Sequence, residues 1–78
     1  MGHELTKNDI KKMEEEIEYR IHEVRKAALD DVKETRAQGD LSENFEYHAA
    51  KRFKNKNESR IRYLQRTIKN ATVIDDSS

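Results

Sequence analysis

Just past the middle of the chain stands the stretch Gly39-Asp40-Leu41-Ser42-Glu43-Asn44-Phe45-Glu46-Tyr47, with helical periodicity on both sides of it. Gly39 is the only glycine after position 2, and the chain has no proline. No other interior stretch offers a residue that reverses the chain so easily. The sequence therefore predicts two long helices that fold back on each other, with this stretch at the tip.

The residues of this stretch suit the end of one helix and the start of the next. Gly39 lacks a Cβ and accepts positive φ, which predicts an αL C-cap for the first helix. Asp40 is expected to be the N-cap of the second helix, which would begin at Leu41, with Glu43 at the reach-back position of a capping box. By this interpretation Asp40 and Glu43 are helix caps, so any chemical role for them needs a separate argument.

The composition favours a thin domain over a rounded one. Of 78 residues, 33% are hydrophobic and 41% are charged. That balance is too polar for a thick core, but it suits a two-helix coiled coil whose buried surface is a narrow seam. Disorder is the competing interpretation of such a composition, and the regular apolar spacing argues against it.

Both arms carry an apolar seam with steps of three and four residues. In the first helix, about residues 6–38, it runs through Ile10, Met13, Ile17, Ile21, Val24, Ala28, Val32 and Thr35. In the second helix, about residues 41–70, it runs through Ala50, Phe53, Asn57, Ile61, Leu64 and Ile68. The eleven-residue repeat predicts a nearly straight pair, and Asn57, the polar seam residue, is expected to set the register. The predicted fold is all-α: a long antiparallel two-helix coiled-coil hairpin with a tight tip turn at residues 39–42.

The two ends of the chain carry further signals. Thr6 is expected to cap the N–H of Asp9 at the start of the first helix. After Asn70 the run Thr72-Val73-Ile74 is β-prone, and a strand cannot stand alone. It is expected to pack on the helices or to belong to a sheet whose partner is missing. Residues 71–78 are therefore interpreted as a severed connection to an absent C-terminal domain.

Charge is unevenly distributed along the chain, although the net charge is zero. Residues 1–47 carry 8 lysines and arginines against 13 acids, whereas residues 48–66 carry 7 against 1. One interpretation is attraction between the two helices, and the other is a basic flank that meets a polyanion or an acidic protein surface. Five basic residues lie roughly opposite the second seam and are expected to form a solvated face: Arg52, Lys56, Arg60, Arg62 and Arg66.

Several function classes find no support in the residues. The chain has no cysteine, no glycine-rich phosphate loop and no nucleophile–base arrangement, and a rod without a concave pocket is a poor enzyme by itself. No apolar run approaches the about 20 residues of a membrane span, so we expect a cytoplasmic protein with no membrane contact. Leu41 and Phe45 at the tip form either a local staple of the first helical turn or an apolar contact for whatever receives the tip.

The tip sequence resembles a known family. The segment Gly39-Asp40-Leu41-Ser42-Glu43-Asn44, followed by Glu46-Tyr47-His48-Ala49-Ala50-Lys51, is similar to the hallmark segment of the bacterial Gre transcript-cleavage factors. The likeness covers roughly residues 5–75 and includes Arg36, Arg60-Ile61 and Ala71-Thr72-Val73-Ile74-Asp75. The resemblance implies the N-terminal coiled coil of a factor that also has a C-terminal globular domain.

The resemblance also implies a function. Gre factors insert their coiled coil into the secondary channel of backtracked bacterial RNA polymerase, and the polymerase then cleaves its own transcript. Matched by motif position, Asp40 and Glu43 are the acids that help hold the second magnesium ion in that complex. The chain is accordingly expected to be an accessory factor and not an enzyme. It would have no cofactor of its own, and its magnesium would be shared with the polymerase.

Other roles follow from the same resemblance. Ser42, Asn44, Leu41 and Phe45 are expected to support the tip, and Phe45 stands where the family commonly has alanine, so tip contacts are expected to differ. Contacts to the polymerase and to the 3′ segment of the nascent RNA are expected from Lys51, Arg52 and Arg36. A monomeric hairpin is expected. Two alternatives remain open: a channel-binding regulator that does not stimulate cleavage, and a plain coiled-coil scaffold.

Overall fold

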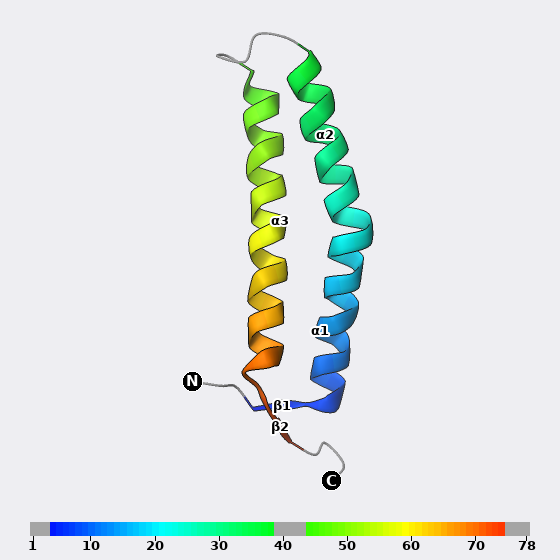
Figure 1. Cartoon of the computed structure of the whole chain (residues 1–78), viewed down its shortest axis with the longest axis vertical. Helices are drawn as coiled ribbons and strands as arrows, with labels where there is room; N and C mark the ends of the chain where they lie inside the picture. The colour runs from blue at the N-terminus through cyan, green and yellow to red at the C-terminus, as the bar shows by residue number, and fades with distance from the viewer. Residues whose placement is uncertain (1–3, 39–43, 75–78) are drawn as a thin grey trace.

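The computed structural model describes residues 4–38 and 44–74, which form a long helical hairpin (Figure 1). Its elements are β1 (Glu4–Thr6), α1 (Lys7–Tyr19), a π-helical turn η1 (Arg20–Val24), α2 (Arg25–Ala37), α3 (Phe45–Lys69) and β2 (Thr72–Ile74). The first three helical elements make one continuous arm that runs antiparallel to α3 (Figure 1). The molecule measures 58 × 23 × 15 Å. The predicted all-α hairpin is confirmed, and none of these described helices is long and apolar enough to cross a membrane.

The first arm begins at the predicted cap. The Thr6 hydroxyl accepts a hydrogen bond from the Asp9 N–H at 3.0 Å, and the Asp9 carboxylate accepts one from the Thr6 N–H at 3.1 Å. This reciprocal pair is a capping box. The Thr6 N–H also lowers the pKa of Asp9. The predicted cap at Thr6 is thereby confirmed.

The base of the hairpin is closed by a short parallel strand pair. β2 pairs with β1 in the register Glu4↔Thr72, Leu5↔Val73 and Thr6↔Ile74. The prediction that β2 would pack on the helices or lack its partner is therefore wrong, because its partner lies at the other end of the chain. Three residues are too few to show the alternating pattern of a strand, so β1 could not be predicted from its sequence. A connection from residues 71–78 to a further domain stays a prediction.

The second arm begins later than predicted. α3 starts at Phe45 and not at Leu41, and its N-cap is Asn44, whose Oδ1 accepts from the Tyr47 N–H at 3.0 Å. Asp40 is therefore not the N-cap of this helix. The tip stretch contains several good capping residues in succession, and capping preference alone cannot rank them. The predicted C-cap Gly39 and the capping-box position Glu43 lie outside the described residues.

The seam was predicted correctly on one arm and only partly on the other. All eight positions predicted for the first arm are buried or half-buried. On the second arm Phe53 is 54% exposed, so its predicted seam position is wrong. A line of buried and half-buried residues on α3 instead runs through Tyr47, Ala50, Lys54, Asn57, Ile61, Leu64 and Ile68, with the half-buried Glu58 and the buried Thr67 beside it. This is a seven-residue repeat, typical of a coiled coil, and not the predicted eleven-residue repeat.

The first arm contains one residue more than a continuous seven-residue repeat allows. Its N-terminal half buries or half-buries Ile10, Met13, Ile17, Arg20 and Val24. Its C-terminal half does the same with Ile21, Arg25, Ala28, Val32 and Thr35. The two series are offset by one residue and overlap at η1, where the Arg25 N–H bonds to the Arg20 carbonyl, five residues back. The π-helical turn therefore accommodates the extra residue.

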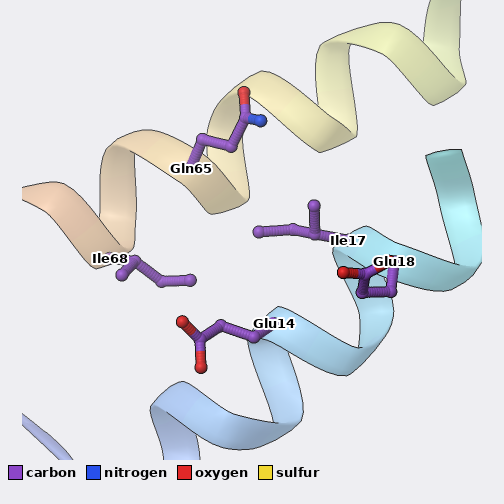
Figure 2. A pocket seen from close by; sticks show the side chains of 5 residues that line it. All are labelled: Glu14, Ile17, Glu18, Gln65 and Ile68. Carbon is purple, nitrogen blue, oxygen red and sulfur yellow. The ribbon is translucent and has the colours of Figure 1, made fainter.

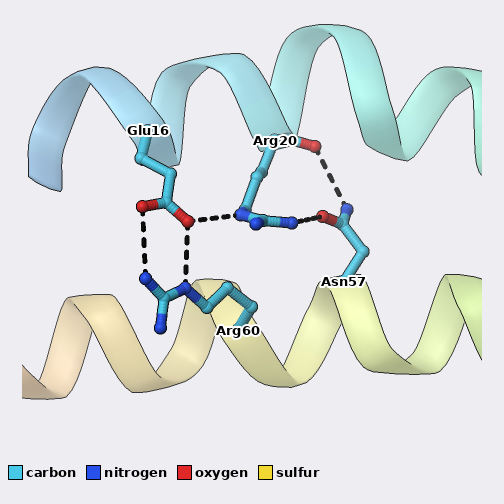
Figure 3. A network of polar contacts seen from close by, with 4 residues as sticks. All are labelled: Glu16, Arg20, Asn57 and Arg60. Carbon is cyan, nitrogen blue, oxygen red and sulfur yellow. Dashed lines mark hydrogen bonds and ion pairs between the residues drawn. The ribbon is translucent and has the colours of Figure 1, made fainter.

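A buried amide faces this turn from the opposite helix. Asn57 is 3% exposed, and its Nδ2 donates to the Arg20 carbonyl at 3.2 Å. Its Oδ1 accepts from the Arg20 guanidinium at 3.0 Å (Figure 3). Both polar ends of the side chain are thus satisfied, as a buried amide requires. The predicted seam position of Asn57 is confirmed.

Candidate functional site at the tip and along the basic helix

The structure describes part of the predicted site. Asp40, Leu41, Ser42 and Glu43 lie outside the described residues, so their predicted roles as acids and tip support stay predictions. The remaining site residues are described: Arg36, Asn44, Phe45, Lys51 and Arg52. They lie on the last turn of α2 and the first two turns of α3, on both sides of the stretch that carries the two acids.

Asn44 joins the ends of the two arms. Its Nδ2 donates to the Thr35 carbonyl at 2.6 Å, while its Oδ1 caps α3 through the Tyr47 N–H at 3.0 Å. Thr35 is itself 6% exposed, and its hydroxyl donates to the Asp31 carbonyl at 2.8 Å. One side chain therefore connects the last turn of α2 to the first turn of α3. We call this set of contacts the Asn44 clasp. It fixes the separation of the two ends of the stretch that contains Asp40 and Glu43.

Lys51 is held beside the clasp. Its ammonium lies 5.7 Å from the centroid of the Tyr47 ring, within the range of a cation–π contact. The Tyr47 ring in turn lies 5.5 Å from the ring of His48, at a tilt of 60°. The Tyr47 N–H also bonds to Asn44, so Tyr47 contacts both the clasp and the Lys51 ammonium.

Phe45 and Arg36 are both exposed. Phe45, the first residue of α3, has 80% of its surface exposed. The staple between Leu41 and Phe45 was predicted on the assumption that both lie in one helix. α3 begins at Phe45, and Leu41 lies outside the described residues, so the staple stays a prediction. An apolar contact of Phe45 with a partner stays a prediction.

Some of the opposite charges on the two arms form ion pairs within the hairpin. Arg60 bonds to the Glu16 carboxylate through Nε at 2.9 Å and through Nη2 at 3.3 Å (Figure 3). Arg25 forms a two-point pair with Glu58, the one acid of residues 48–66, with both bonds at 2.8 Å. Arg60 therefore pairs with the other arm although it lies on the predicted solvated face. All five members of that face are exposed, as predicted: Arg52, Lys56, Arg60, Arg62 and Arg66.

Glu16 is the most strongly perturbed of these acids. Hydrogen bonds from Arg60, and then from Arg20, lower the pKa of Glu16 from 4.5 to about 2. The Arg20 bond is the shorter of the two, at 2.7 Å. The pair with Arg25 likewise lowers the pKa of Glu58. Both acids therefore favour the folded hairpin in their charged form.

The sides of the rod bear shallow hollows. One lies between the arms near the base and is lined by Glu14, Ile17 and Glu18 of α1 with Gln65 and Ile68 of α3 (Figure 2). Its lining thus combines two carboxylates and an amide with two isoleucines. Across residues 4–38 and 44–74, no group of three or more metal-ligating side chains comes together.

Comparison with known proteins gives a consistent result. The family model described as "Transcription elongation factor, N-terminal" matches residues 3–73. The chain is similar to transcription elongation factor GreA of Allorhizobium ampelinum, with 44% identity over 71 residues, covering 91% of this chain and 45% of that protein. Chlorobium limicola GreA is 39% identical over 71 residues with the same coverage, and Brucella canis GreA is 42% identical over 73 residues, covering 94% and 46%. The chain thus spans about half the length of these relatives.

The Asn44 clasp predicts a graded loss of stability. Asn44→Ser keeps a side-chain oxygen for the cap but removes the amide donor to the Thr35 carbonyl, at an expected cost of about 1 kcal/mol. Asn44→Ala also removes the cap and should cost about 1 kcal/mol more. Urea unfolding followed by circular dichroism measures both. Equal stability of all three proteins would show that the clasp does not hold the arm ends together.

The Glu16 ion pairs predict acid sensitivity. Since the pKa of Glu16 is lower in the folded chain, its contribution is complete above the unfolded value of 4.5 and is lost as the pH falls toward about 2. Glu16→Gln should therefore lower stability at pH 7 and flatten the dependence of the unfolding free energy on pH between about 5 and 2. The control is Glu15→Gln, an exposed acid outside these pairs. An unchanged pH profile in Glu16→Gln would refute this account.

Proposed function

The chain belongs to the family of GreA- and GreB-type transcription elongation factors, whose N-terminal domain it matches, and we propose that it stimulates transcript cleavage by backtracked bacterial RNA polymerase. The observation that carries the proposal is the tip motif held between the clasped ends of a long hairpin. The relatives are about twice as long as this chain. The proposal therefore concerns the activity of the hairpin alone.

The shape of the hairpin supports this role. A rod 58 Å long with a cross-section of 23 × 15 Å can carry a tip into a narrow channel that a rounded domain would not enter. The Asn44 clasp connects the two arms directly behind the tip stretch. A rigid connection there limits the positions that the tip acids can take, which favours productive placement in a partner's active site.

Asp40 and Glu43 are the residues to which we assign the chemical role. Their carboxylate oxygens are ligands of the kind that magnesium prefers, and magnesium commonly takes only one or two protein carboxylates. When bound and shared with the polymerase, the ion would lower the pKa of a water molecule and stabilise developing charge. In this proposal the two acids hold and orient the magnesium ion, and the polymerase cleaves its own transcript. The chain is an accessory factor without a resident cofactor.

Contacts with the complex would come from the groups that surround the tip. Arg36, Lys51 and Arg52 are exposed positive residues near the clasp, suited to the 3′ segment of the nascent RNA or to the polymerase. Phe45 offers an apolar contact from the first turn of α3. Ser42 and Leu41 would support the tip. In this proposal the hairpin acts as a monomer.

Transcript cleavage in stalled, backtracked polymerase complexes tests this proposal. The hairpin should accelerate release of the 3′ fragment, and Asp40→Asn/Glu43→Gln should abolish the acceleration. Glu46→Gln, an exposed acid in the first turn of α3, is the matched control and should remain active. Circular dichroism beforehand confirms that all three are helical.

The outcome separates the proposal from its alternatives. Equal cleavage by the wild type and the double variant would remove the assigned role of the acids. Binding without cleavage by the wild type would indicate a channel-binding regulator. If the polymerase does not bind the hairpin and the hairpin does not compete with a full-length factor, the proposal fails in favour of a scaffold.

A further inference from the structure

The extra residue of the first arm is confined to its middle by the apolar pattern. If it lay closer to the tip, the seam would exchange Ala28, Val32 and Thr35 for Ala27, Asp31 and Glu34. If it lay closer to the base, the seam would exchange Ile10, Met13 and Ile17 for Lys11, Glu14 and Glu18. All six incoming residues are exposed in the structure, and five are charged. Burying them without partners is costly, so the extra residue must lie between Ile17 and Ala28.

Between Ile17 and Ala28, the apolar pattern does not determine where the π-helical turn lies. One series offers Arg20 and Val24 to the seam, and the other offers Ile21 and Arg25. All four residues are half-buried. Each series thus contributes one apolar residue and one arginine, and burial alone gives no preference between neighbouring placements of the π-helical turn.

We propose that Asn57 determines the register of the hairpin by holding the extra residue in the turn Arg20–Val24. Its Nδ2 donates to the backbone carbonyl of Arg20, while its Oδ1 accepts from the guanidinium of the same residue. A shift of one residue would bring the carbonyl of Tyr19 or Ile21 to this position. Ile21 has no side-chain donor, and the Tyr19 phenol is exposed and carries a single O–H in place of the guanidinium N–H groups of Arg20. A shift to Ile21 leaves the buried amide oxygen unpaired, and a shift to Tyr19 requires that exposed phenol to turn into the seam, so both are unfavourable.

A neighbouring ion pair reinforces the choice. Arg20 donates from Nε to Glu16 at 2.7 Å and from Nη1 to Asn57 at 3.0 Å, so its guanidinium is held from both ends (Figure 3). Glu16 in turn accepts from Arg60 of the opposite arm at 2.9 Å. A placement of the π-helical turn that moves Arg20 would remove its guanidinium from both partners.

A cycle of two changes tests the proposal. Deletion of His22, an exposed residue of η1, removes the extra residue and places both halves of the arm in one continuous repeat. The single and combined variants of Asn57→Leu and the deletion would be compared by amide NMR and hydrogen exchange. The wild type should give one set of resonances. Asn57→Leu alone should give several sets for residues 18–28 and at least tenfold less protection of the Arg25 amide.

In the deletion background, the same substitution should have little effect. The deleted chain needs no register choice, so Asn57→Leu should keep one set of resonances there, with protection in the middle of the first arm within about twofold. Arg20→Met removes the guanidinium but keeps the backbone carbonyl, and it should reproduce multiple sets even if Asn57→Leu fails to fold. Deletion of Lys33, an exposed residue of α2, is the control and should abolish cooperative folding. One set of resonances with unchanged Arg25 protection in either substituted full-length variant would overturn the proposal.

Discussion

The hydrogen bonds between Asn57 and Arg20 are the constraint on which the hairpin depends. The apolar residues that are buried among those described number four: Ala28, Ala50, Ile61 and Leu64. Two of them are alanines, so burial supplies a modest and poorly directional force. Between Ile17 and Ala28, the apolar residues give no preference between neighbouring placements of the π-helical turn. A buried amide that is satisfied in only one alignment selects among them, as single polar seam residues do in coiled coils.

The rest of the rod follows from that alignment. The ion pairs of Glu16 with Arg60 and of Arg25 with Glu58 form only when the arms are in this register. They lie on partly exposed surface, where such pairs contribute little to stability but do penalise a wrong alignment. At the upper end, the phase of α2 places the Thr35 carbonyl against the Asn44 amide.

Sequence periodicity was sufficient for the architecture but not for its details. The first seam and the Thr6 cap were predictable because each rests on local spacing. Phe53 was misplaced because an apolar side chain one position off the seam is indistinguishable in sequence from a seam residue. Lys54 took its place, since a lysine stem can cover apolar surface while its ammonium reaches water. The partnership of Arg60 with Glu16 and the π-helical turn depend on the opposite arm, so neither has a local signal.

At the tip, too, some features were predictable from local sequence and others depend on contacts between the arms. The resemblance indicated Asn44 as a support residue. Its partner, the backbone carbonyl of Thr35, could not be predicted because every residue has such a carbonyl. The start of α3 could not be ranked among the neighbouring capping residues. The sequence therefore predicted which residues form the tip, whereas the structure shows how its two ends are held. This rigid attachment is the feature that the proposed role in a partner's active site requires.

The most direct test of the account is to locate the tip in the complex. A photo-crosslinking amino acid at position 45, beside the Asn44 clasp, would be compared with the same group at position 69, at the base of α3. With backtracked bacterial RNA polymerase, position 45 should crosslink to residues lining the active centre or to the RNA 3′ segment, while position 69 should reach only the outer surface. Crosslinking of position 45 to the outer surface, or none from either position, would contradict the view that the hairpin exists to deliver its tip.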